Sequence, residues 1–375
     1  MLNAFGEYCT LWKLNVNINK TKVVIFGSRG QSNATFSLLN RDLEICDSYN
    51  YLGVVFSKGC SFAQAQQRIK NQASKALHLL YSRIHNLNLP IDCQLKLFDH
   101  TILPILLYGC EIWGFGDLSP IETIHNQFLR NILKVKKSTP LYMLYGETGR
   151  YPLSIYIKHR MVSFWIKMIS GKVGKYSLLL YKSLLINDVN HTNKWLITIK
   201  NTLTDCGYSY VWNSQQTPNP VKLKYELLQR LKDQYIQTWS SNIQKSNKSI
   251  NYRIYKTEFK LEPYLISLPD NYKYTFIRYR TCNHKLPVEV GRWMSVDFEQ
   301  RICPLCEINT VGDEYHYLFD CTYFIKEREN YIPRYYYTRP NTFKYNKLFN
   351  SSKRSIIVKL CMFLKIILNK FMSIN

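Results

Sequence analysis

Apolar residues return every three or four positions along most of this chain, which is the spacing of amphipathic helices. Between 62 and 84 the apolar stripe is long, and most of the basic residues fall outside it. The same spacing predicts helices over 1–12, from Pro90 with a kink at Pro104, and over 119–132, 152–169, 221–243 and 356–372. The tetrapeptide Ser119-Pro120-Ile121-Glu122 predicts a capping box at the start of the helix over 119–132.

Strands are predicted only near the N-terminus. Residues 22–26 are β-branched and stopped by Gly27, 35–46 predict a hairpin around Asn40, and 49–56 predict one further strand. The fold class that follows is α+β and mostly helical, with a small β-containing piece that has too few strands to stand alone. Residues 215–220, which include two prolines, predict a loop or linker.

Composition indicates a folded protein with a polyanionic partner. With 46% hydrophobic residues in 375 positions the chain can bury a core, and 50 Lys and Arg against 26 Asp and Glu leave a net charge of +24. Residues 151–260 alone carry 17 basic and 5 acidic residues, about half of that excess. This distribution predicts a diffuse surface that faces phosphates and not a shaped pocket.

The cysteines and the targeting signals bear on location. Eleven cysteines, an odd number without dense spacing, are typical of a reducing compartment in which a few cysteines hold metal. The first twenty residues contain Glu7 and no apolar run, so they predict neither a signal peptide nor a transit peptide. Lys359, Lys365 and Lys370 interrupt the apolar stretch 356–372, which predicts a packed helix and not a transmembrane segment. We therefore expect an intracellular protein without a membrane partner.

The most specific chemical signal lies near the C-terminus. Cys303 and Cys306, followed by His316 and Cys321, form a C-x2-C-x9-H-x4-C pattern. Three thiolates and one imidazole make a complete tetrahedral set for Zn²⁺ and leave no position for water, so the predicted zinc is structural. The competing interpretation is that these are ordinary buried cysteines and a surface histidine. Cys282 lies close in sequence but lacks a partner at ligand spacing.

Two basic clusters fit more than one interpretation. Lys134, Lys136 and Lys137 end a predicted helix, where cations either stabilise the helix dipole or contact phosphates. Within 272–280, aromatic and basic residues alternate just before the cysteine pattern. This alternation suits base stacking and phosphate binding, and equally a half-buried strand or an amphipathic helix with solvated cations.

Catalytic signatures are missing from the sequence. It holds no phosphate-binding loop, metalloprotease helix or nucleophile elbow, and no adjacent pair of aspartates. The histidines outside the cysteine pattern have no assignable Ser, Cys or carboxylate partner. For them a surface or satisfied core position is a better interpretation than catalysis.

Several segments carry a family resemblance. They are 2–12, 17–27, Tyr51-Leu52-Gly53-Val54, 103–114, 283–293, and 313–321 with the cysteine and histidine pattern. Together these segments resemble the C-terminal part of the reverse transcriptases of non-LTR (LINE-like) retrotransposons. By this resemblance, Tyr51-Leu52-Gly53-Val54 is similar to the primer-grip turn, the last motif of the palm. The resemblance implies the end of a palm over 1–58, a helical thumb-like region over 59–150, a basic helical connector over 151–265, a zinc-knuckle module over 266–340 and a C-terminal helix over 341–375.

The resemblance also implies what the chain lacks. In that family, polymerase chemistry needs three metal-binding carboxylates, two of them in an aromatic-x-Asp-Asp turn that would lie upstream of Met1. We therefore expect a truncated RNA-directed DNA polymerase that is inactive alone, with Mg²⁺ as a cofactor only if the missing palm is supplied. Residual binding of an RNA or DNA template–primer, in the nucleus, is what the family implies.

Charge placement and resemblance together nominate the nucleic-acid contacts. They are Lys20, Lys22, Arg68, Lys70, Lys75, Arg83, Arg278, Arg280, Lys285 and Arg292. Two other hypotheses stay open. One is a zinc-stabilised adaptor for protein partners, whose charge only adds solubility, and the other is a decayed retroelement copy without function.

Overall fold

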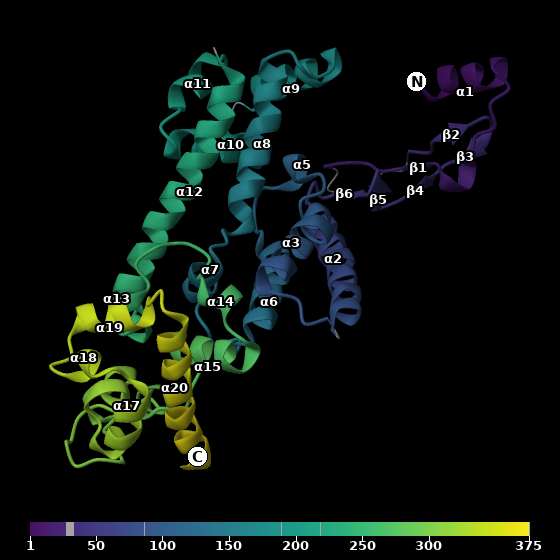
Figure 1. The fold of residues 1–375 in the computed structure, drawn as a ribbon. Coiled ribbons are helices and arrows are strands. Elements are labelled where there is room, and N and C mark those ends of the chain that lie inside the picture. Colours follow the sequence, from purple (N-terminus) through teal and green to yellow (C-terminus); the bar gives the residue numbers. More distant parts are fainter. Residues whose placement is uncertain (28–33, 86, 189, 218, 375) are drawn as a thin grey trace. The chain divides into compact units, whose positions relative to one another are not determined.

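Figure 1 shows the computed structural model, which describes residues 1–375 apart from 28–33, 86, 189, 218 and 375. The fold class is α+β and mostly helical, as predicted. The strands are β1 (Lys22–Val23), β2 (Ser37–Leu38), β3 (Arg41–Asp42), β4 (Glu44–Ile45), β5 (Ser48–Tyr51) and β6 (Val54–Ser57). The helices of eight or more residues are α1 (Leu2–Leu11), α2 (Ala63–Ile84), α3 (Ile91–Thr101), α6 (Ser119–Leu133), α7 (Leu141–Thr148), α8 (Leu153–Ile169), α9 (Lys175–Asn187), α10 (Lys194–Asp205), α12 (Pro220–Lys245), α15 (Asp270–Arg280), α19 (Thr342–Phe349) and α20 (Arg354–Ile374). The shorter helices are α4 (Leu103–Leu106), α5 (Cys110–Trp113), α11 (Ser209–Ser214), α13 (Tyr252–Tyr255), α14 (Tyr264–Ser267), α16 (Pro287–Trp293), α17 (Ile325–Tyr331) and α18 (Arg334–Tyr337).

The strands pair as three short two-stranded sheets within the described residues. β2 and β3 form the hairpin expected over 35–46, with Leu39 and Asn40 in left-handed backbone at its turn. β1 pairs with β4 in parallel, and it is shorter than the strand predicted over 22–26.

The single strand predicted over 49–56 is wrong. β5 and β6 form an antiparallel hairpin whose last pair is Tyr51 with Val54, so Leu52 and Gly53 make a two-residue turn. Both turn residues have positive φ, 47° and 86°, as a type I′ turn requires. The Tyr108 hydroxyl donates to the Leu52 carbonyl at 2.8 Å and holds the turn in place. The apolar side chain of Leu52 continued the strand pattern, whereas the turn over 51–54 that the resemblance implies is confirmed.

The predicted helices form close to their expected bounds. α2, α8, α12 and α20 cover the predicted stretches, and the chain breaks between α3 and α4, just before Pro104. The predicted capping box is wrong, because the Asp117 carboxylate accepts the Ser119 backbone N–H at 2.9 Å and the Ser119 hydroxyl at 2.8 Å. Asp117 therefore caps α6, and these hydrogen bonds, the backbone one above all, lower the pKa of its carboxyl.

No described helix has both the length and the apolar composition that crossing a bilayer requires.

The chain divides into two compact units, each assembled from three stretches of sequence. The first comprises Met1–Ser82, His100–Ile124 and Ile157–Pro218, and the second Arg83–Asp99, His125–Tyr156 and Asn219–Asn375. In the first unit, the buried Trp165 indole donates to the Tyr181 hydroxyl at 2.7 Å. In the second, Phe98 and Phe128 stack with ring centroids 4.3 Å apart. The five-part division drawn from the resemblance stays a prediction.

A buried ion cluster lies within the second unit. Arg280, the last residue of α15, is fully buried, and its guanidinium donates to both carboxylate oxygens of Glu147 on α7, at 3.1 and 3.0 Å. It also lies 3.3 Å from Glu262, which pairs with the buried Lys256. Tyr264 donates its hydroxyl to Glu147 and places its ring 5.1 Å from the guanidinium carbon. Two cations and two carboxylates thus neutralise one another inside the protein.

Neighbouring charges and burial act in opposite directions on the pKa of the Glu147 carboxyl. Burial alone would raise the pKa of its carboxyl, but the charges of Arg280 and Lys256 and the hydrogen bonds from Arg280 and Tyr264 hold that pKa below its ordinary value. Glu147 is therefore an anion in the folded protein at neutral pH. Its ionised form contributes to stability above the ordinary carboxyl pKa, and this contribution is lost as the pH falls through the lowered, folded-state value.

We expect Glu147→Gln to lower the free energy of unfolding by about 3–5 kcal/mol, because Arg280 would lose its bidentate partner. Urea denaturation followed by circular dichroism measures this loss. The decline of stability in acid should also be shallower in the variant, since one lowered carboxyl pKa has been removed. Glu258→Gln, which breaks an exposed pair with Lys260, is the matched control and should unfold like the wild type. Equal effects of the two substitutions would contradict the assignment of Glu147 as the buried partner of Arg280.

Candidate metal centre

The first two candidate ligands lie on a loop closed by a short β-bridge. Ile302 pairs with Val311 in antiparallel fashion, and the Cys303 N–H donates to the Thr310 carbonyl at 2.9 Å. Cys306 lies in the loop between the two sides of this bridge. The bridge therefore fixes the start and the end of the segment that carries both cysteines.

The other two ligands lie on a turn of π-helix, His316–Asp320, and the residue after it. The Cys321 N–H donates to the His316 carbonyl at 2.8 Å, a bond that spans five residues. In an α-helix, residues five apart point about 140° away from each other. The wider π turn brings His316 and Cys321 back to one side of the backbone. Buried Arg328 secures this turn by donating to the carbonyls of Leu318 and Cys321, each at 2.8 Å.

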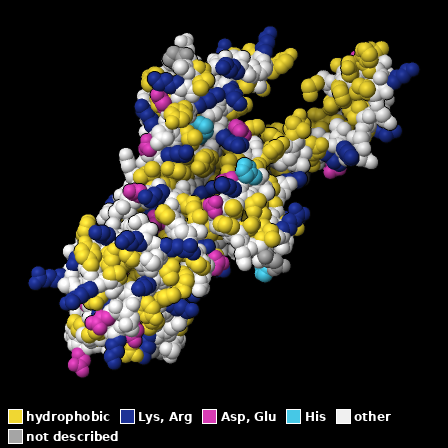
Figure 2. All heavy atoms as spheres, viewed as in Figure 1, with side chains coloured by type: hydrophobic (Ala, Val, Ile, Leu, Met, Phe, Trp, Pro, Cys, Tyr) yellow, Lys and Arg dark blue, Asp and Glu magenta, His cyan; other side chains and the backbone are white. Residues whose placement is uncertain are grey.

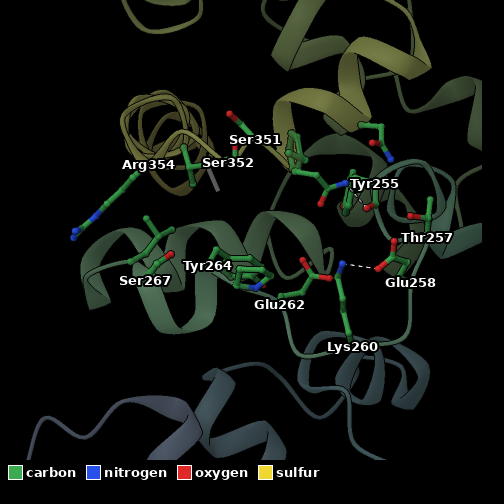
Figure 3. Close-up of a pocket in the computed structure, with 16 residues that line it drawn as sticks. Tyr255, Thr257, Glu258, Lys260, Glu262, Tyr264, Ser267, Ser351, Ser352 and Arg354 are labelled. Atoms are coloured by element: carbon green, nitrogen blue, oxygen red, sulfur yellow. Dashed lines mark hydrogen bonds and ion pairs between the residues drawn. The ribbon is translucent and has the colours of Figure 1, made fainter.

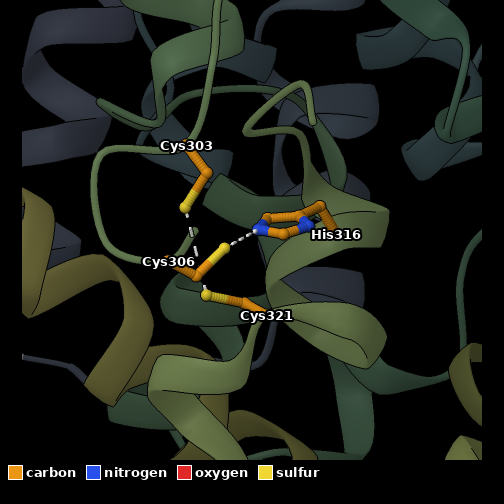
Figure 4. Close-up of side chains that lie close together, drawn as sticks. All are labelled: Cys303, Cys306, His316 and Cys321. Atoms are coloured by element: carbon orange, nitrogen blue, oxygen red, sulfur yellow. Dashed lines mark hydrogen bonds between the residues drawn. The ribbon is translucent and has the colours of Figure 1, made fainter. Parts of the chain in front are cut away.

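The four donor atoms have the spacing that one tetrahedral ion requires. Figure 4 shows the side chains of Cys303, Cys306, His316 and Cys321 pointing toward one another. Cys303 Sγ lies 4.0 Å from Cys321 Sγ, Cys306 Sγ lies 3.4 Å from His316 Nε2, and all four atoms fall within 4.8 Å of one another. Bonds of about 2.3 Å to sulfur and 2.0–2.1 Å to nitrogen put tetrahedral donors ~3.6–3.8 Å apart. The cluster can therefore hold a metal ion.

Surrounding groups orient the ligands. Thr310 Oγ1 lies 3.1 Å from His316 Nδ1, so the other ring nitrogen, Nε2, faces the sulfurs. The Leu305 N–H points at Cys303 Sγ from 3.4 Å, and the Asp313 carboxylate accepts the His316 N–H at 2.8 Å. These contacts supply the supporting shell that metal ligands usually have.

A hydrogen bond between Cys303 and Cys321 moves the pKa values of the two thiols in opposite directions. The hydrogen bond with Cys321 is the main reason that the pKa of Cys303 is lowered to about 3. Further hydrogen bonds, one of them from the Leu305 N–H, act in the same direction, and burial acts the other way. The same contact raises the pKa of Cys321, because a thiol beside a thiolate keeps its proton. A thiolate is the form of cysteine that binds metal.

The structure brings together a second group that sequence spacing missed. Cys282, His284 and Glu314 are all buried, and their donor atoms lie within 4.8 Å of one another. His284 Nδ1 accepts the Leu286 N–H at 3.4 Å, which leaves Nε2 to donate to Glu314 at 2.9 Å. Asn251 donates to the other Glu314 oxygen at 2.7 Å. Glu314 is 30 residues from His284, so only the fold makes them neighbours.

The nominated cations on α2 differ in exposure. Arg68 and Lys75 are exposed and seven residues apart, so they share the face opposite the buried Leu77. Lys70 is half-exposed beside the buried face, and Arg83 is exposed near the C-terminal end of the helix. The predicted amphipathic arrangement of this helix is confirmed.

The other nominated cations divide into two groups. Lys22 pairs with Glu44, and Arg292 donates to Glu289 at 3.1 Å. Arg280 is buried in the ion cluster, so its predicted contact with nucleic acid is wrong. Lys20, Arg278 and Lys285 form no ion pair with any described residue. On the face drawn in Figure 2, Lys and Arg side chains are scattered widely, in keeping with a diffuse basic surface.

The structure thus defines a mostly helical α+β protein with a Cys3His cluster, buried except for the half-exposed Cys306, that can hold a metal ion. Three curated proteins of Drosophila melanogaster are similar to this chain. They are the RNA-directed DNA polymerase from mobile element jockey (23% identity over 146 residues, 38% of this chain and 16% of the relative), the probable RNA-directed DNA polymerase from transposon BS (24% over 192 residues, 49% and 20%) and that from transposon X-element (24% over 135 residues, 34% and 14%).

The chain is related to the RNA-directed DNA polymerases of non-LTR, LINE-like retrotransposons. It spans a fifth or less of the length of these curated relatives. No protein-family model matches the chain, and no solved structure is significantly similar to it.

We expect Cys306→Ser to abolish stoichiometric metal binding, because three remaining ligands leave the shell incomplete. Elemental analysis of purified protein measures the metal ion per chain, and the absorption spectrum of Co²⁺-loaded protein reports thiolate ligation. Cys60→Ser, at an exposed cysteine, is the control and should keep the metal. Wild-type protein purified without chelators and found metal-free would rule the site out.

Proposed function

We propose that this chain is the C-terminal part of a LINE-like reverse transcriptase that holds one structural Zn²⁺ and binds RNA or DNA. The observation that carries the proposal is the Cys3His cluster, whose four donors converge in a chain related to RNA-directed DNA polymerases. Sequence pattern and comparison support the same family independently of the coordinates.

The proposed zinc ligands are Cys303, Cys306, His316 and Cys321. Bound zinc supplies a cross-link between the bridged loop that holds the first two ligands and the π turn that holds the last two. All four positions of a tetrahedral ion are taken by protein atoms, which favours a structural role over a catalytic one. The buried Arg328 and the hydrogen bond between Thr310 and His316 hold the two segments in register for the ion.

Nucleic acid is the proposed partner because of charge. A net charge of +24 and the exposed face of α2 with Arg68 and Lys75 suit the phosphates of a template–primer. The relatives are polymerases directed by RNA, and the same class of ligand is proposed for this chain. Contacts to phosphates position nucleic acid without reading its sequence, so we expect little base preference from these residues.

Polymerisation by this polypeptide alone is not part of the proposal. Phosphoryl transfer by the two-metal route needs carboxylates that hold both Mg²⁺ ions, and these 375 residues contain no adjacent aspartates. A carboxylate pair supplied by a complete palm would be needed to bind Mg²⁺ for that reaction.

Binding to labelled oligonucleotides should weaken steeply with salt, because each neutralised phosphate contributes about −0.7 (single strand) to −0.9 (duplex) to the slope of log K against log[salt]. Arg68→Gln with Lys75→Gln should reduce that slope by about 1.4–1.8. Fluorescence anisotropy across a salt series measures both quantities. Arg68→Lys with Lys75→Arg keeps the charges and should keep the slope; binding that ignores salt would refute the proposal.

In a primer-extension assay with Mg²⁺ and all four deoxynucleotides, the purified chain should give no product above background. The reason is the missing pair of metal-binding carboxylates. Extension that persists after repeated purification would sink this part of the proposal, whereas extension restored by adding a palm-containing polypeptide would support it.

A further inference from the structure

A hollow of about 370 Å³ in the second unit gathers basic residues from separate stretches of the chain. We call it the cationic groove, and its basic lining residues are Lys134, Lys136, Arg278, Lys285 and Lys365. No acidic side chain lines it, and none of the five forms an ion pair with a described residue. Like charges that share a concave surface repel one another, and a bound polyanion relieves that repulsion.

The walls of the cationic groove are fixed by contacts within the protein. Asn283 accepts the Lys136 backbone N–H at 3.0 Å and donates to the Thr139 hydroxyl at 2.6 Å. These bonds tie the segment after α6 to the loop after α15. α20, which carries Lys365, packs along α15, which carries Arg278. The backbone that carries these cations is therefore held in place before any ligand arrives, which lowers the entropy lost on binding.

The cluster of Lys134, Lys136 and Lys137 can be interpreted either as the basic end of a helix or as a set of phosphate contacts, and Lys134 shows that the two interpretations are compatible. It directly follows α6 and has a φ of +52°, a backbone conformation that glycine adopts freely at the ends of helices. A lysine there costs about 1 kcal/mol relative to an unstrained residue. Its backbone ends the helix, while its side chain lines the groove and lies 3.8 Å from the centre of the Tyr274 ring.

The surroundings favour a single strand over a duplex. Lys136 Nζ lies 4.7 Å from the ring centre of Trp293, which is 48% exposed and able to stack on a base. Grooves that bind single strands combine cations along the backbone with aromatic rings for the bases. In a duplex the bases are already stacked on one another, so they offer no free face to an exposed aromatic ring.

A second cavity differs from the cationic groove in the charges that line it. It has a volume of about 580 Å³, and Figure 3 shows Lys260 beside Glu258, with Glu262 and Arg354 also lining it. There the charges have mixed signs, so the cavity offers a polyanion no net attraction. The cationic groove differs because its charged lining residues all have one sign.

We propose that the cationic groove binds the phosphodiester backbone of single-stranded nucleic acid, with Trp293 as a stacking surface for a base beside it. This inference rests on the proposed function, since it assigns a place and a strand state to nucleic-acid binding.

The test is fluorescence anisotropy with a labelled 20-nucleotide strand, as RNA and as DNA, and with the matching duplex. The variant Lys134→Gln, Lys136→Gln and Lys365→Gln should bind the single strand at least tenfold more weakly, with a salt slope smaller by about 2. Lys245→Gln, Lys326→Gln and Lys353→Gln removes the same charge elsewhere in the second unit and should bind like the wild type. Replacing the three groove lysines with arginine should restore affinity, and an unchanged melting temperature shows that the groove variant folds.

The outcomes separate the two proposals. Equal binding by the groove and control variants, with wild-type binding intact, overturns the groove and leaves the proposed function standing. Wild-type protein that binds no oligonucleotide overturns the proposed function itself. Equal losses for duplex and single strand overturn the assignment to single strands, and a loss confined to either RNA or DNA supports the groove and names the sugar it accepts.

Discussion

A guanidinium lies in a protein interior only when acceptors take up its N–H groups and its charge, and this requirement organises the second unit around Arg280. Glu147 and Glu262 meet it, so α7, the end of α15 and the segment before α14 must come together. The approach is so close that a side chain at Gly149 would place its Cβ 2.4 Å from the Leu261 nitrogen, and Gly149 has a φ of +62°. Residues two apart on a helix point about 200° apart, so burying Arg280 turns Arg278 toward solvent.

The same stretch of chain leads from the ion cluster to the metal ligands. α15 ends at Arg280, and within four residues the chain reaches His284, which is hydrogen-bonded to Glu314. Glu314 lies two residues before the ligand His316. The loop and π turn that present the four ligands contain little regular structure, and they are held by Arg328, by the Ile302–Val311 bridge and by this buried hydrogen bond. A bound ion would add the remaining link between them.

Local pattern was a good guide where burial follows sequence periodicity. The stripe of apolar residues on α2 predicted both the helix and its exposed basic face, because a helix repeats every 3.6 residues whatever it packs against. Local pattern failed where one residue can serve two structures. Leu52 has an apolar side chain but lies in a turn, and Asp117, outside the predicted capping box, provides the cap for α6. In both cases hydrogen bonds settled the conformation, to Tyr108 in the first and to Ser119 in the second.

The sequence by itself determined the mostly helical fold class, the family relation and the four candidate ligands, because residue type, helical period and ligand spacing are properties of neighbours along the chain. Only the tertiary structure decided which cations are available. Arg278 and Arg280 look alike in sequence. Arg280 is nevertheless buried, paired with the carboxylate of Glu147, which lies more than 130 residues away. Lys365 reads as an interruption of an apolar helix, and it becomes part of a groove because α20 packs on α15. Burial and pairing of charge depend on contacts between distant segments, and these contacts exist only in the folded chain.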